Sequence, residues 1–186
     1  MRIVSLSLAT AAVLLSGGAQ AASVYTRIDD AQCETLETYE DGGVDLRCPG
    51  LEGYDVFVSE GDARLDVDYG VKTENFETFS AFNNIGDTVE WLTNARGVPE
   101  AAIIRFLISV DGREAQALVV SRVNTESQDG CVIGVVDARL EQANGMARGI
   151  GAMAPSFDCS IDPVVIAPGA SELVAGFSGA NQPPSE

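Results

Sequence analysis

Carboxylates are the only catalytic side chains that this sequence supplies in quantity. Its 186 residues include 28 aspartates and glutamates against 11 lysines and arginines, and the formal net charge is −17. The chain contains no histidine, which excludes a Ser-His-Asp triad, a Cys-His pair and an imidazole metal ligand. The one lysine, Lys72, lies in neither a Ser-x-x-Lys nor a Lys-Thr-Gly motif, and no Gly-x-Ser-x-Gly elbow is present. The remaining catalytic possibility is a pair of facing carboxylates, as glycoside hydrolysis requires.

Asp66 and Asp68, with Arg64 beside them, are the candidate site residues. These three alternate with apolar residues, as in a half-buried strand that has one charged face. The apolar partners are Ala63, Leu65, Val67 and Tyr69. The simpler interpretation is a solvated strand face. The functional interpretations are ligand binding or a carboxylate pair that cleaves glycans.

No cofactor and no metal site is predicted. Calcium would need only oxygen ligands, but the Asp-x-Asp-x-Asp-Gly loop is absent. The fragments Asp29-Asp30 and Gln128-Asp129-Gly130 do not reach three correctly spaced ligands. Nucleic acid is excluded as a partner because the chain lacks a basic footprint.

Residues 1–21 have the features of a secretory signal peptide. Met1 and Arg2 precede an apolar run over residues 3–15, and Ala19-Gln20-Ala21 forms a small-residue cleavage site. The run is shorter than the ~20 residues that cross a bilayer, so no transmembrane anchor is expected. Residue 22 is alanine rather than cysteine, so no lipid anchor is expected either. We therefore predict a periplasmic or secreted protein whose mature chain begins at Ala22.

Four cysteines, all in the mature chain, predict two disulfides. An even number of cysteines in an exported protein is typical of structural bridges. Three pairings are possible, and we favour Cys33–Cys48 with Cys131–Cys159, because each bond then closes a local unit.

The elements that must position these residues are mostly strands. Two hairpins are predicted, one around a turn at residues 59–62 and one around Asp111-Gly112, which suits a type I′ turn. Further strands are expected over residues 44–48, 88–93, 102–110, 115–123 and 132–136. The last three are apolar on both faces, which indicates central strands with cover on each side. Phe76, Phe79 and Phe82 recur every three residues, which suggests one helical turn bearing a small hydrophobic cluster.

One helix follows the strands. Asp137 could cap it, and Pro155 would end it. Apolar residues recur at helical spacing at Leu140, Ala143, Ala147, Ile150 and Ala154. Gly145 and Gly149 share one face, which suggests close packing of the helix against a sheet.

The fold class is therefore α+β. We predict a single domain over residues 22–159, with an antiparallel meander of six to eight strands and one C-terminal helix packed on it. An all-β sandwich with a peripheral helix is the alternative. Residues 160–186, rich in proline, glycine, serine and alanine, are expected to form a loosely ordered tail, although residues 164–166 and 173–177 could dock.

Several ordered segments also resemble a known group of proteins. They are Cys33 to Cys48 with Pro49-Gly50, Gly53-Tyr54-Asp55-Val56-Phe57-Val58, Glu60-Gly61-Asp62, Val89-Glu90-Trp91, Leu118-Val119-Val120, and the block from Cys131 to Cys159. Together they resemble small exported proteins of alphaproteobacteria with four cysteines. The resemblance implies export and the cysteine pairing. That group has no known activity, so the resemblance transfers no active-site residues.

The sequence thus favours an exported, non-catalytic binding or envelope-interaction module. The partner would be a protein or an envelope component, and the acidic charge suits a cationic one. Alternatives are a small carboxylate-dependent glycan hydrolase, or an inhibitor of a cationic secreted enzyme such as lysozyme.

Overall fold

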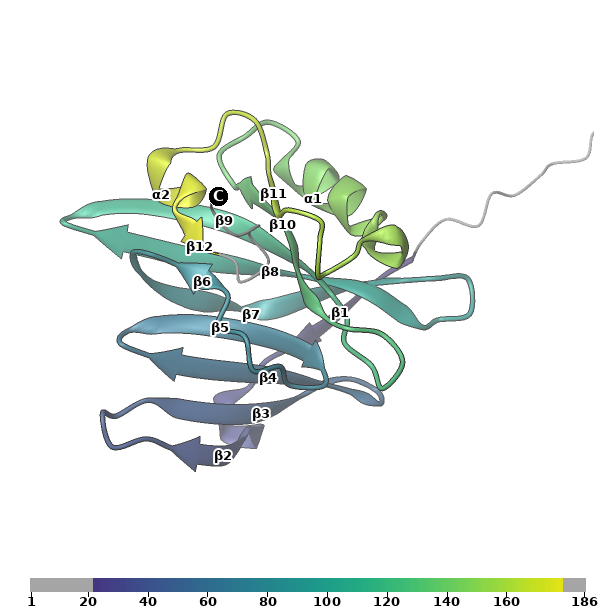
Figure 1. The fold of residues 1–186 in the computed structure, drawn as a ribbon, viewed down its shortest axis with the longest axis horizontal. Helices are drawn as coiled ribbons and strands as arrows, with labels where there is room; N and C mark the ends of the chain where they lie inside the picture. The colour runs from purple at the N-terminus through teal and green to yellow at the C-terminus, as the bar shows by residue number, and fades with distance from the viewer. Residues whose placement is uncertain (1–21, 179–186) are drawn as a thin grey trace, which may run out of the picture.

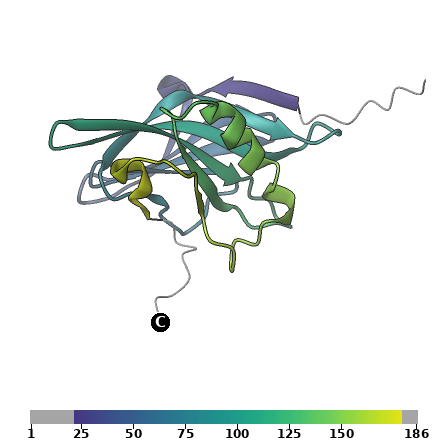
Figure 2. The same ribbon diagram turned by 90° about the horizontal axis from the view of Figure 1, so that it is seen from above.

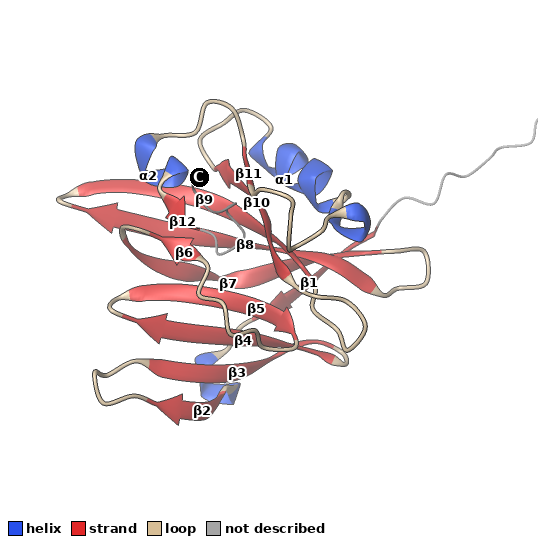
Figure 3. Cartoon of the chain, in the orientation of Figure 1, coloured by secondary structure: helices blue, strands red, loops and turns tan. Residues whose placement is uncertain are grey.

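The computed structural model describes residues 22–178, and the predicted signal peptide lies outside them. Antiparallel strands make up most of this part of the chain, and helices are short (Figure 3). The described residues form twelve strands, of which three have only two residues each. This exceeds the six to eight strands expected from the sequence, because short pairings carry no periodic signal.

The larger sheet has six strands in the order β1-β7-β8-β9-β10-β11 (Figure 1). All neighbours are antiparallel except β10 and β11. The strands are β1 (Ala22–Arg27), β7 (Phe82–Thr93), β8 (Pro99–Val110), β9 (Arg113–Arg122), β10 (Cys131–Asp137) and β11 (Val165–Ile166).

The smaller sheet is a four-stranded meander. A short 3-10 helix, η1 (Asp30–Gln32), leads from β1 into it. Its strands are β2 (Glu34–Thr38), β3 (Val44–Leu51), β4 (Tyr54–Gly61) and β5 (Arg64–Gly70). A separate two-stranded pairing joins β6 (Thr78–Phe79) to β12 (Phe177–Ser178).

Both predicted hairpins are present, with one turn displaced. Asp111 and Gly112 have φ angles of 52° and 74°, as a type I′ turn requires. In the other hairpin β4 continues through Gly61, and the turn falls at Asp62 and Ala63 instead of residues 59–62. Those two residues have φ angles of 53° and 56°, so the same turn geometry is achieved without glycine.

The larger sheet is covered on both faces, as its apolar central strands predict. One face packs against the smaller sheet through a cluster that includes Tyr69, Trp91 and Phe106. The other face packs against α1 (Ala143–Gly151) through Ala147 and Ile150. Figure 2 shows α1 and the C-terminal residues 172–178 on opposite sides of β9 and β10.

The helix is shorter than the sequence suggested. Asp137 ends β10 rather than capping the helix, and its buried carboxylate accepts bonds from the backbone N–H groups of Arg139 and Ser171. Gly145 and Gly149 face open space, so their predicted close packing is wrong. Gly151 makes the close contact instead, because a Cβ atom there would lie 2.4 Å from Leu92 Cδ1.

Two further expectations are corrected by packing between distant segments. Phe79 is buried in β6 against Phe106 and Phe177, whereas Phe76 and Phe82 are exposed, so the three rings form no helical turn. Up to residue 178 the chain after residue 160 is not a loose tail, and it docks in the two stretches, 164–166 and 173–177, for which docking was considered. It contributes β11, the short helix α2 (Glu172–Ala175) and β12, and Val174 and Phe177 are buried.

The fold is therefore mostly antiparallel sheet, with one face of the larger sheet covered by a C-terminal helix. Within residues 22–178 no helix has the length and apolar character needed to cross a membrane.

Candidate functional site

The predicted residues Arg64, Asp66 and Asp68 do share one face of β5, but that face is not solvated. The chain after β5 folds back over it: Thr73 donates its backbone N–H to Asp68 Oδ2 at 2.8 Å, and Thr78 Oγ1 donates to the Leu65 carbonyl oxygen at 2.5 Å. Asp66 is only 4% exposed. The expectation of a solvated face is therefore wrong, because strand periodicity cannot indicate which later segment covers a face.

Burial perturbs both carboxyl groups. Removal from water, together with the neighbouring charges of Asp68 and Glu77, raises the pKa of Asp66 to about 8. Burial also raises the pKa of Asp68, although hydrogen bonds from Thr73 oppose this shift. Asp66 consequently carries a proton at neutral pH. Neither Asp66 nor Asp68 lines any of the three hollows described below.

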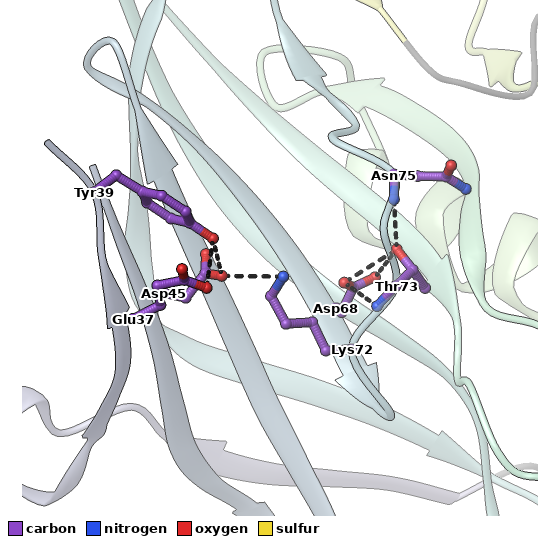
Figure 4. A network of polar contacts seen from close by, with 7 residues as sticks. All are labelled: Glu37, Tyr39, Asp45, Asp68, Lys72, Thr73 and Asn75. Atoms are coloured by element: carbon purple, nitrogen blue, oxygen red, sulfur yellow. Dashed lines mark hydrogen bonds and ion pairs between the residues drawn. The ribbon is translucent and has the colours of Figure 1, made fainter. Parts of the chain in front are cut away.

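Lys72 belongs to a polar network that lies on the same side of the smaller sheet as Asp66 and Asp68 (Figure 4). Its Nζ atom is 3.1 Å from Asp45 Oδ2, and the Tyr39 hydroxyl donates to the same oxygen at 2.8 Å. The hydrogen bond to Asp45 is the main cause that raises the pKa of Tyr39 to about 12. A hollow of about 270 Å³ lies beside the network.

Lys72 is held as a cation rather than activated as a nucleophile. Burial lowers its pKa, but the hydrogen bond and charge of Asp45 outweigh burial, and the pKa is raised overall. A nucleophilic lysine needs the opposite shift. Asp45 is buried, which raises its pKa, yet hydrogen bonds from Ser59, Tyr39 and Lys72 prevail and lower it. The network therefore fastens the segment after β5 to the smaller sheet.

A groove between the two sheets is the largest of the three hollows, with a volume of about 910 Å³. It lies on the face of the smaller sheet opposite Asp66 and Asp68, and η1 and the first half of β7 form its walls. The apolar lining comes from Ile28, Val44, Leu46, Val58, Leu65 and Ile85. A hollow of about 420 Å³, lined in part by Phe82 and Leu107, shares Asn84 with it. The volume is within the range of protein ligand sites.

Carboxylates dominate the charged lining of this groove. Asp29, Asp30, Glu60 and Asp87 are opposed by Arg27 alone, which forms an ion pair with Asp87. A hydrogen bond from Gln32 lowers the pKa of Asp29, and one from Thr88 lowers that of Asp87. These two carboxyl groups are therefore ionised at neutral pH, and the rim of the groove carries a net negative charge.

The sequence identified little of this groove. Asp29-Asp30 was notable only as an incomplete calcium motif, and nothing indicated Glu60 or Asp87. Among the residues that the structure describes, no group of three or more cysteines, aspartates or glutamates could hold a metal ion. The site consists of residues from η1, β3, β4, β5 and β7, which only the fold brings together.

Both predicted disulfides are present. Cys33 pairs with Cys48 across β2 and β3, and Cys131 pairs with Cys159 beyond α1. The first lies close to the groove, because Cys48 is part of the groove lining and Cys33 directly follows η1. It therefore fixes η1, with Asp30 and the N-cap residue Asp29, against the smaller sheet.

No protein-family model, no curated protein and no solved structure matches this chain. What the groove can bind therefore follows from its own geometry and charge.

Proposed function

We propose that this protein is an exported, non-catalytic binding module that holds a cationic segment of a partner protein in the groove between its sheets. The observation that carries the proposal is the combination of an apolar floor with four rim carboxylates around about 910 Å³. An apolar floor supplies affinity through burial of surface. The carboxylates select basic partners and speed their approach.

Two features support export. The predicted signal peptide would direct the chain out of the cytoplasm, and two disulfides are typical of proteins that fold in an oxidising compartment. An acidic protein outside the cytoplasm can meet cationic secreted enzymes, so inhibition of such an enzyme is one form that this binding would take.

Carboxylate-dependent catalysis has less support from the same geometry. Asp66 is protonated but buried, Asp68 is bonded to Thr73, and neither reaches the groove. A glycan hydrolase needs an acid and a second carboxylate on opposite sides of one cleft.

The test compares two double variants that remove the same number of charges. Asp29→Asn/Asp30→Asn changes the groove rim, and Asp111→Asn/Glu141→Gln changes exposed carboxylates outside it. The probe is a fluorescent peptide of alternating lysine and valine, and its Kd is measured by anisotropy at low and physiological salt. We expect saturable, salt-sensitive binding that the rim variant weakens about threefold to tenfold, as ~1 kcal/mol implies.

The distant variant should bind nearly as well as the wild type. If both variants weakened peptide binding equally, only the total charge of the protein would matter. The groove would then not be the binding site. Absence of saturable binding at low salt would contradict the proposed function.

A further inference from the structure

Building on the proposed function, we infer that the partner segment enters the groove as an extended strand and pairs with the interrupted edge of β7 at Ile85. The proposed function specifies the charge of the partner segment, and strand pairing also specifies its conformation. Strand pairing requires a backbone edge with no strand beside it, room for a strand, and a groove whose floor and rim suit the side chains of that strand.

The edge of β7 that faces β1 is only half occupied. β1 pairs with β7 from Thr88 to Thr93, and the last backbone contact is the Ile28 N–H donated to the Asp87 carbonyl oxygen at 2.8 Å. The chain then turns away through η1. At the far end, Asn83 donates its N–H to the Ala63 carbonyl oxygen at 3.1 Å.

Ile85 lies between these two contacts. Its N–H donates to the Oδ1 atom of Asn84, the preceding residue, at 2.8 Å instead of to another strand. The pairing of β7 with β8 is regular from Phe82 to Ile85, and its register shifts only between Ile85 and Val89. Backbone groups of alternate residues in a regular strand point to the same side, so those of Ile85 face the edge that Asn83 uses. Within residues 22–178, no strand pairs with β7 on this side between the two contacts.

The open stretch coincides with the groove. Asn84, Ile85, Gly86 and Asp87 all belong to its lining. Ala63 and Ile28 already occupy the positions opposite Asn83 and Asp87, so the roughly 13 Å between these two residues leaves room for about three residues of a paired strand. This is the arrangement used in β-augmentation, in which backbone hydrogen bonds supply affinity and alternate side chains supply specificity.

The surroundings determine which side chains such a strand should carry. One face of an added strand would meet the apolar floor, including Val58 and Leu65. The other face would leave long side chains free to reach the rim, where Asp29 and Asp87 are ionised. Alternating apolar and basic residues satisfy both faces, so the occupant is a basic segment of alternating pattern.

The experiment uses the lysine-valine peptide and an analogue with the same side chains that is N-methylated at every backbone amide. N-methylation removes the donors that strand pairing needs and keeps charge and side-chain pattern. We expect the analogue to bind the full disulfide-bonded protein roughly tenfold more weakly. Binding of the two peptides within twofold would overturn strand pairing while the proposed groove function stands. Failure of both peptides to bind would overturn the proposed function as well.

A matched pair of protein variants tests the same contact. Asn84→Ala removes the side chain that occupies the Ile85 N–H, whereas Asn84→Asp keeps an oxygen there and adds a negative charge. If the peptide pairs as a strand, Asn84→Ala should bind the lysine-valine peptide about threefold to fivefold more tightly than the wild type does. The same substitution should not increase the affinity for the N-methylated peptide. If the groove recognises only the charge of the peptide, Asn84→Asp should bind the peptide more tightly than Asn84→Ala. That result would refute strand pairing at Ile85.

Discussion

Replacing Asp66 with asparagine should change how the stability of this protein depends on pH. Asp66 is buried beneath the segment that follows β5, and its pKa rises from 3.8 to about 8 on folding. Between these values the folded protein keeps a proton that the unfolded chain has released. The stability associated with Asp66 is therefore fully present below pH 4 and is lost progressively as pH rises towards 8.

The size of this effect follows from the shift. About four pH units at ~1.4 kcal/mol each amount to roughly 6 kcal/mol, which is a large part of the stability of an ordinary domain. Asparagine has nearly the same shape and does not ionise. Between pH 5 and pH 9 we therefore expect the wild type to lose roughly 4 kcal/mol relative to Asp66→Asn.

The assay is urea unfolding of the disulfide-bonded protein, followed by circular dichroism at pH 5, 7 and 9. The control is Asp111→Asn, an exposed turn residue whose φ of 52° asparagine tolerates. The free-energy difference between this control and the wild type should be nearly constant with pH. If the difference for Asp66→Asn is equally constant, Asp66 is not a buried neutral acid and the reasoning fails.

Three further predictions concern stability. Gly151→Ala should lower the free energy of unfolding by about 1–3 kcal/mol, because its Cβ meets Leu92, whereas Gly149→Ala should raise it by roughly 0.5–1 kcal/mol, as thermal melting would show. Lys72→Met should cost about 1–3 kcal/mol in urea unfolding at pH 7 by leaving buried Asp45 without its cation, and a loss under 0.5 kcal/mol would contradict this structural role. Replacing both cysteines of a bridge with serine should cost about 3 kcal/mol for the loop of 15 residues and about 3.5 kcal/mol for the loop of 28, and thiol titration of the denatured, unreduced wild type should find no reactive thiol.

Local signals predicted the parts of the fold that depend on local chemistry. Alternating residues marked β5, and Asp111-Gly112 marked a hairpin, because side-chain direction and turn geometry depend on near neighbours. The cysteine pairing also followed, since both bonds close short stretches of chain. The length of the helix was overestimated, because residues 138–142 continue its apolar spacing but form turns after β10.

The candidate site could not be predicted in the same way. Its lining joins Asp29 near the start of the domain to Glu60 at the end of β4 and Asp87 in β7, and no repeat or motif connects these positions. The burial of Asp66 depends on a later segment that is itself polar and aperiodic, so its sequence resembles that of an exposed loop. In both places the deciding contacts are between elements distant in the chain, where periodicity carries no information.

The position of the only tryptophan provides the protein with an internal optical reporter. Trp91 is fully buried in β7, its ring meets Tyr69 edge-on, and its Nε1–H donates to Thr26 Oγ1 of β1 at 2.8 Å. The indole therefore has a dry environment and a single polar partner, which belongs to the strand nearest the predicted cleavage site. Release of β1 from the sheet would remove that partner and admit water, so the emission of Trp91 should move to longer wavelength. Docking of β1 can thus be followed in the unlabelled protein by its own fluorescence.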